Sequence, residues 1–169
     1  MIVHVGGDGS HLALVDTASY TSFVGRNWAE GDLLYKHLVE QANSLHVLAW
    51  GTGFETDWRV EVRAGITLKR DFREFSGNIK STAGALHLVN YDSLTMAAQF
   101  EDHRLPDKET NHYSVPLKSG LYAFRVLQLV NPGSRWWESL GDGAAFILEY
   151  EQTKGQSYHF TAGPWIGDV

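Results

Sequence analysis

The sequence predicts an all-β protein built as a two-sheet antiparallel β-sandwich. Short runs of aliphatic and aromatic residues recur along the chain, and turns that contain glycine, proline or asparagine separate them. The clearest run covers residues 121–129, between a turn centred on residues 118–120 and the stop signal Asn131-Pro132-Gly133. Residues 58–62 alternate strictly between apolar and charged, which is typical of a strand with one buried face. A partly open β-barrel is the alternative arrangement, and at most one short helix is expected.

The composition is that of a single globular domain over residues 1–169. The chain is 43% hydrophobic and 20% charged, and its length suffices for a sizeable core without disulfides or structural metal. Cysteine is absent, which favours a cytoplasmic setting. The first residues lack the basic and apolar regions of a signal peptide, and no stretch has the length of a membrane-spanning helix.

Turn and alternation signals assign the individual strands in order. They predict strands at residues 10–16, 45–50, 58–62, 84–90, 121–129, 144–151 and 158–160. Between them, residues 101–111 form the most polar stretch of the chain and contain Pro106, which predicts a long surface loop. Three tryptophans are expected in the core, namely Trp28, Trp50 and Trp58.

One segment, residues 33–42, fits two structures. Leu34 and Leu38 follow helical spacing and Asp32 could cap a helix. The sequence that follows Gln41 would also make a good turn into the strand at 45–50. The hairpin is the favoured interpretation.

Charge and motifs exclude several functions. The chain has 20 acidic and 14 basic side chains, a formal net charge of −6, and no basic cluster beyond Lys69-Arg70, which argues against nucleic-acid binding. It lacks a nucleophilic cysteine, a Gly-x-Ser-x-Gly elbow and a phosphate-binding glycine loop. Glu149 and Glu151 would share one strand face side by side, whereas a glycosidase needs two carboxyl groups across a cleft. The chain is therefore not predicted to be an enzyme, and no cofactor is expected.

The histidines do not predict a metal site. None belongs to a His-x-His pair or a His-Glu-x-x-His helix. His46 and His87 lie in predicted strands, on the face opposite their apolar neighbours, and are expected to be solvated or hydrogen-bonded. A metal-dependent enzyme with dispersed histidine ligands is kept as an alternative. The eight histidines are His4, His11, His37, His46, His87, His103, His112 and His159.

Tryptophans and acidic residues remain as candidate binding residues. Trp136 and Trp137 are adjacent, so strand alternation cannot bury both rings, and one is a candidate for a protein interface. Together with Trp165 they also allow an alternative function, a carbohydrate- or small-ligand-binding sandwich with a stacking platform.

Six segments, in this order, resemble the competence-J type nuclease inhibitors and related small bacterial immunity-like proteins. They are Asp16 with Tyr20 and Phe23 ahead of Trp28-Ala29-Glu30-Gly31, then residues 45–50, 58–62, 84–88, 115–126 and 146–150. The resemblance implies a cytoplasmic β-sandwich that binds and blocks a toxin or nuclease without chemistry of its own. No binding residue is carried over from the family, because no partner-contacting motif is matched.

The function predicted from these observations is a non-enzymatic, protein-binding inhibitor. Nucleases present basic clefts, so an acidic surface would speed association with such a partner. The sequence leaves the oligomeric state and the strand order open. The predicted partner-binding residues are Glu101, Asp102, Asp107, Glu109, Trp136 and Trp137.

Overall fold

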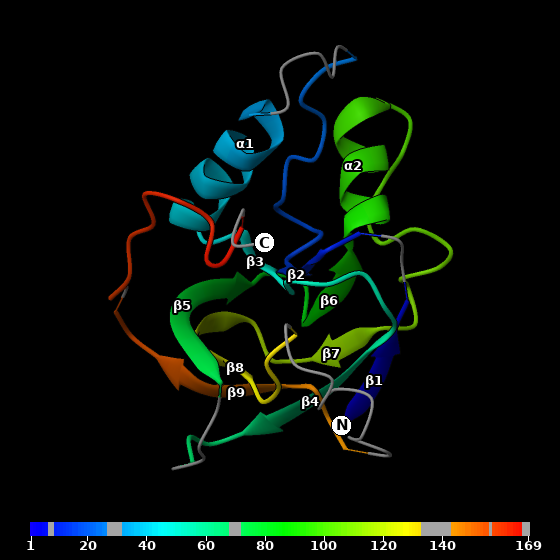
Figure 1. The fold of residues 1–169 in the computed structure, drawn as a ribbon. Helices are drawn as coiled ribbons and strands as arrows, with labels where there is room; N and C mark the ends of the chain where they lie inside the picture. The colour runs from blue at the N-terminus through cyan, green and yellow to red at the C-terminus, as the bar shows by residue number, and fades with distance from the viewer. Residues whose placement is uncertain (7–8, 27–31, 68–71, 133–142, 156, 167–169) are drawn as a thin grey trace.

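Two β-sheets face each other, and two helices cover the outer side of one of them (Figure 1). The computed structural model describes residues 1–6, 9–26, 32–67, 72–132, 143–155 and 157–166. The predicted two-sheet sandwich is confirmed, and the sheets do not close into a barrel.

The larger sheet has five strands in the order β1-β4-β9-β8-β5. These strands are β1 (Ile2–Val5), β4 (Trp58–Ala64), β9 (Phe146–Thr153), β8 (Gly120–Gln128) and β5 (Arg73–Ser81). The smaller sheet has the order β3-β2-β6-β7, formed by β3 (Val47–Gly51), β2 (His11–Val15), β6 (Ala85–Asn90) and β7 (Ser114–Pro116).

One strand pair departs from the expected antiparallel arrangement. β4 and β9 are parallel, whereas the other paired strands are antiparallel. Parallel neighbours need a long connection instead of a hairpin. The chain between β4 and β9 supplies one, because it forms β5, the rest of the smaller sheet and β8 before it returns.

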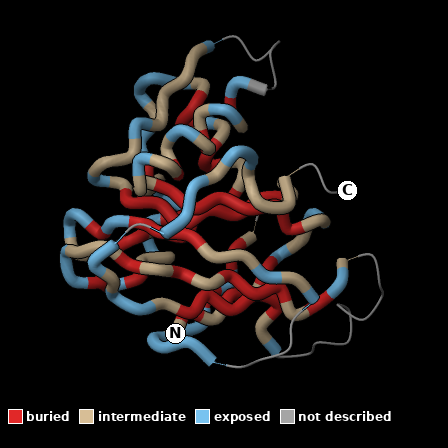
Figure 2. The backbone as a smooth tube through the Cα atoms, turned by 90° about the vertical axis from the view of Figure 1, so that its left-hand side faces the viewer, coloured by how far each residue is buried: buried red, intermediate tan, exposed pale blue. Residues whose placement is uncertain are grey.

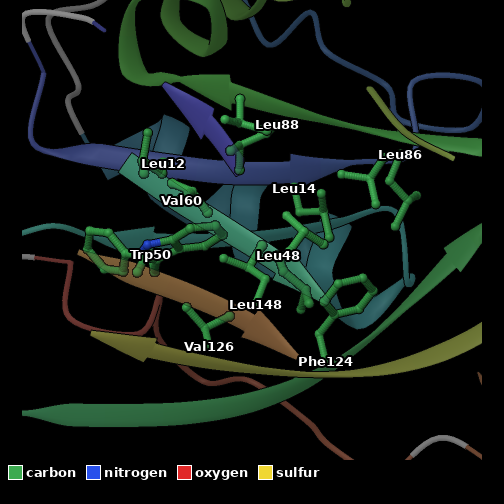
Figure 3. Packing of buried hydrophobic residues seen from close by; sticks show 14 of the residues in the cluster. Leu12, Leu14, Leu48, Trp50, Val60, Leu86, Leu88, Phe124, Val126 and Leu148 are labelled. Carbon is green, nitrogen blue, oxygen red and sulfur yellow. The ribbon is translucent and has the colours of Figure 1, made fainter. Parts of the chain in front are cut away.

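The main core lies between the two sheets (Figure 3). Leu12 and Leu14 of β2 face Val60, Phe124 and other residues of the larger sheet across this core. Trp50 and Trp58 are buried in it, as predicted, whereas Trp28 lies outside the described residues.

A second apolar cluster lies between the smaller sheet and the helices. Ala13 and Val15 of β2 belong to it, which explains why all five residues of β2 are buried. In Figure 2 the buried residues concentrate in the strands at the middle of the molecule, and exposed residues concentrate in the surrounding connections.

The favoured hairpin at residues 33–42 is wrong. Asp32–Asn43 forms the helix α1, whose Leu34, Leu38 and Ala42 are buried against the smaller sheet. Spacing of four residues places these side chains on one helical face. The sharp turn needed to enter β3 is made just after the helix, where Leu45 adopts a φ of 68°.

The expectation of at most one short helix is also wrong, because Tyr91–Gln99 forms a second helix, α2. Asn90 ends β6 and caps α2, and its side chain accepts a hydrogen bond from the Ser93 amide at 2.9 Å. Leu94, Ala97 and Ala98 face the second cluster. Both helices are too short to cross a bilayer, and no other described helix meets that length.

The predicted strand at residues 158–160 is not formed. The backbone N–H and C=O of Phe160 bond instead to the side-chain amide of Asn43, at 2.8 and 2.9 Å. The Phe160 ring packs against both apolar clusters, so this segment lies across the layers and does not extend a sheet.

Candidate protein-binding surface

The connection between α2 and β7 contains the four acidic residues selected from the sequence. Residues 100–113 leave the C-terminal end of α2 and return beside the helix to β7, as Figure 1 shows. The predicted long surface loop is confirmed. Buried Leu105 and Thr110 attach it to the body of the protein.

Asp107 stabilises this loop internally. Its Oδ1 accepts hydrogen bonds from the Glu109 amide at 3.0 Å, and from the Thr110 amide and hydroxyl at 2.8 Å each. Burial alone would raise the pKa of the Asp107 carboxyl, but hydrogen bonds from Ser93, Thr110 and Glu109 hold it below its usual range. This carboxylate is therefore occupied within the protein.

The other three acidic side chains, Glu101, Asp102 and Glu109, are exposed. Within the described part of the chain, none of them forms an ion pair. Glu101 and Asp102 follow the C-terminal cap of α2, where the helix dipole disfavours negative charge. Their position therefore does not stabilise the helix.

Arg104 partly offsets this unfavourable charge. Its guanidinium donates hydrogen bonds to the backbone carbonyls of Glu101 and His103. The loop over residues 101–109 also contains Lys108, so its two basic and four acidic side chains leave a local charge of −2.

An open groove follows the loop. At the end of α2 it is lined by Arg26, Gln99, Phe100, Glu101, Asp102 and Arg104. It continues along Asp102 and Arg104 towards Asp107 and Glu109. Phe100 lines its first part and is 42% exposed, and Met96, one helical turn earlier in the chain, is 43% exposed.

An acidic residue that the sequence analysis did not select lies, like Glu109, near Tyr113. Asp57 precedes β4, and the negative charges of Asp57 and Glu109 both oppose ionisation of the Tyr113 hydroxyl. Burial, followed by these two charges, raises the pKa of Tyr113. The available signal was the segment 51–57, which carries Glu55 and Asp57 and no basic residue.

The tryptophans divide into two groups. Trp136 and Trp137 lie outside the described residues. The Trp165 ring is held within the protein, edge-to-face on Phe75 with ring centroids 5.0 Å apart, and with the Arg73 guanidinium 4.4 Å from its centroid.

Glu149 and Glu151 have different environments although they share a strand face. Glu149 is fully buried, and its Oε1 lies 2.6 Å from Nη2 of Arg63 while its Oε2 lies 3.4 Å from Nη1 of Arg125. The Thr67 amide also bonds to Oε2, at 3.1 Å. Glu151 is exposed. The carboxylates are not opposed across a cleft.

The two strand histidines are hydrogen-bonded, as expected. His87 Nδ1 lies 3.3 Å from the Thr17 hydroxyl, and His46 Nδ1 lies 3.0 Å from Gln41 Oε1, although β3 begins one residue after His46. Among the described residues, no three histidine or acidic side chains come together as ligands for a metal ion.

Comparison with known proteins gives matches in structure. No family model and no curated protein matches the chain by sequence. The crystal structure of ComJ from Bacillus subtilis, an inhibitor of the DNA degrading activity of NucA, superimposes with a TM-score of 0.54. The two share 10% sequence identity over 90% of this chain and 96% of ComJ. The chain has a ComJ-like fold.

The same fold occurs in a second solved structure, crocagin biosynthetic gene J. It also gives a TM-score of 0.54 at 10% identity, over 91% of this chain and 96% of that chain. The resemblance to the competence-J type inhibitors is thus confirmed at the level of the fold. The ComJ-like fold is shared by an inhibitor and a biosynthetic protein, so functional arguments depend on the surface.

Proposed function

We propose that this protein is a non-enzymatic inhibitor that binds a basic nuclease or toxin in the bacterial cytoplasm, in the manner of an immunity protein. The observation that carries the proposal is the group of exposed carboxylates of Glu101, Asp102 and Glu109, which form no ion pair with a described residue, on a ComJ-like fold. Trp136 and Trp137 stay in the proposal as sequence-based partner contacts.

The electrostatics support a basic partner. A nuclease that binds DNA carries a positive surface, and exposed carboxylates attract such a surface at long range. Such steering mainly raises the association rate and weakens with salt. Asp107 is excluded from the contacting set because its carboxylate holds the loop together.

The test begins with a pull-down from the native host at low salt. We expect a basic protein that salt releases, and whose DNA cleavage the purified protein abolishes at a stoichiometric ratio. The second step reverses three charges, with the substitutions Glu101→Lys, Asp102→Lys and Glu109→Lys. This variant should bind more slowly and lose most of the salt dependence of association.

A matched control separates a local effect from one of net charge. Glu40, Glu55 and Glu151 are also exposed, and their reversal to lysine changes the total charge by the same amount. We expect this control to retain most of the association rate. Equal loss in both variants, or a captured partner whose nuclease activity is unaffected, would contradict the proposal.

A further inference from the structure

The C-terminal end of α2 combines features that do not stabilise the protein. The helix buries Leu94, Ala97 and Ala98, whereas Met96 and the C-cap residue Phe100 are exposed. An exposed aromatic ring loses hydrophobic stabilisation that burial would provide. Beside it, Glu101 and Asp102 occupy the negative end of the helix dipole. A partner that covers this site would relieve both costs.

We propose that Phe100, Glu101 and Asp102 form a recess for an arginine side chain of the partner. This inference rests on the proposed function and specifies which group of the basic partner is recognised. The guanidinium would stack on the Phe100 ring and donate hydrogen bonds to the adjacent carboxylates. Met96, one turn earlier on α2, would contact the aliphatic part of the same side chain.

The charges around the recess favour arginine over lysine. Arg26 and Arg104 also line it, so Glu101 and Asp102 meet an equal number of basic side chains there. A compact ammonium would therefore gain little from charge alone. A guanidinium gains more, because it is planar, is weakly hydrated and stacks on aromatic faces.

Arg104 leaves the carboxylates accessible to an incoming cation. Its guanidinium donates to the backbone carbonyls of Glu101 and His103, and not to the side chains of Glu101 or Asp102. These carboxylates form no ion pair with any described residue. Two charge-assisted hydrogen-bond acceptors are thus available next to the exposed ring.

The test uses the full chain and two capped peptides of equal charge, acetyl-Arg-Arg-Arg-amide and acetyl-Lys-Lys-Lys-amide. Backbone amide shifts are followed by NMR at low salt. We expect the arginine peptide to shift the resonances of residues 96–102 and to bind more tightly than the lysine peptide. Loss of one exposed cation–π contact should weaken the arginine peptide by about two- to fivefold.

Substitutions at Phe100 separate stacking from simple hydrophobic contact. Phe100→Leu keeps an apolar side chain but removes the aromatic face, and should reduce the preference for arginine as Phe100→Ala does. Phe100→Tyr should retain it. Phe54 is a matched control, because it is 43% exposed and precedes an acidic residue, Glu55. Phe54→Ala should leave the titration unchanged.

Several results would overturn the inference. They are equal binding of the two peptides, equal binding by the wild type and Phe100→Leu, shifts centred on residues 54–57, or no shifts at residues 96–102. The peptides require no nuclease, so this test is independent of the inhibition assay. Inhibition without arginine binding at Phe100 would contradict the arginine recess and leave the inhibitor function standing. Arginine binding without any inhibition would contradict the inhibitor function and leave the recess standing.

Discussion

At the scale of single residues, neighbouring acidic side chains have different functions according to their hydrogen bonds. Asp107 is held by Thr110 and by the Glu109 amide, whereas the Glu109 side chain is exposed. On β9, Glu149 is enclosed by two arginines and Glu151 faces solvent. A carboxylate selected from the sequence alone can therefore stabilise the fold or face a partner.

Glu149 links four strands of the larger sheet. Arg63 of β4 and Arg125 of β8 flank it, and Arg125 also pairs with Glu74 of β5. Burial alone would raise the pKa of the Glu149 carboxyl, but hydrogen bonds from Thr67 and Arg63 hold it below its ordinary value of 4.5. Because the folded-state pKa is depressed, this group stabilises the fold above pH 4.5, and that contribution is lost as the pH falls through the folded pKa.

Glu149→Gln should lower the free energy of unfolding by about 2 kcal/mol at neutral pH, because it leaves the two arginines without their shared anion. The variant should also lose less stability than the wild type when the pH falls below 4.5. Urea denaturation at several pH values measures both effects. Glu151→Gln is the control on the same strand face. Equal effects of the two substitutions on stability would contradict a stabilising role for the buried Glu149 carboxylate and its two arginines.

At the scale of elements, packing decides between structures that local patterns leave open. Leu34 and Leu38 suit a helical face, and the residues after Gln41 suit a turn, so residues 33–42 fit both a helix and a hairpin. In the folded protein β2 and β3 present an apolar face formed by Ala13 and Ala49, among others, which needs a cover. A helix with Leu34, Leu38 and Ala42 on one side supplies it.

Leu38→Ala should therefore destabilise the protein by about 2–4 kcal/mol, as expected for a buried leucine in a tightly packed cluster. Leu38 is 3% exposed in α1, whereas Leu33 of the same helix is 39% exposed. Leu33→Ala should change stability by less than about 1 kcal/mol. Chemical denaturation followed by tryptophan fluorescence gives both values. Similar losses for the two variants would contradict the assigned helical face.

At the scale of the whole molecule, the segment over residues 157–166 joins the layers. Phe160 bonds to Asn43 of α1, the Pro164 carbonyl accepts the Gly51 amide of β3 at 3.0 Å, and Trp165 packs on Phe75 of β5. The segment thus contacts the helical layer and one edge strand of each sheet. It covers the side where β3 and β5 approach each other.

Trp165→Ala should reduce stability by about 2 kcal/mol, because it removes the aromatic contact with Phe75 and the cation–π contact with Arg73 together. Tyr158 is a control from the same segment, with 38% of its surface exposed. Tyr158→Ala should cost less than about 1 kcal/mol. Thermal unfolding of the two variants compares these effects. A larger loss of stability for Tyr158→Ala than for Trp165→Ala would contradict the assignment of the main stabilising contact to Trp165.

Strand positions followed from the sequence where a strand has a strong local pattern. The alternation at residues 58–62 predicted β4, and the apolar run after Gly120 predicted β8. β5 was not predicted, because its inner face includes Gly77 between Phe75 and Ile79 and interrupts the apolar pattern. A Cβ at Gly77 would lie 2.5 Å from the side chain of buried Leu48, so a larger residue there would force Leu48 to move.

The acidic loop was predicted as a segment, but the environment of each carboxylate was not. Local polarity marks residues 101–109 as one polar segment. It does not distinguish Asp107, whose carboxylate accepts hydrogen bonds within the loop, from Glu101 and Asp102, which are exposed. The proximity of Asp57 and Glu109 to Tyr113 depends on segments about 50 residues apart along the chain. Side chains that distant in sequence leave no local pattern.

The sequence by itself determined the β-sandwich class, most strands and the acidic, cysteine-free surface chemistry, because alternation, turn residues and charge are local properties. Only the tertiary structure decided that residues 32–43 are helical, that β4 pairs in parallel with β9, and that Glu149 is buried. These features depend on which distant surfaces meet, and the free energy of burying one surface against another overrides weak local preferences.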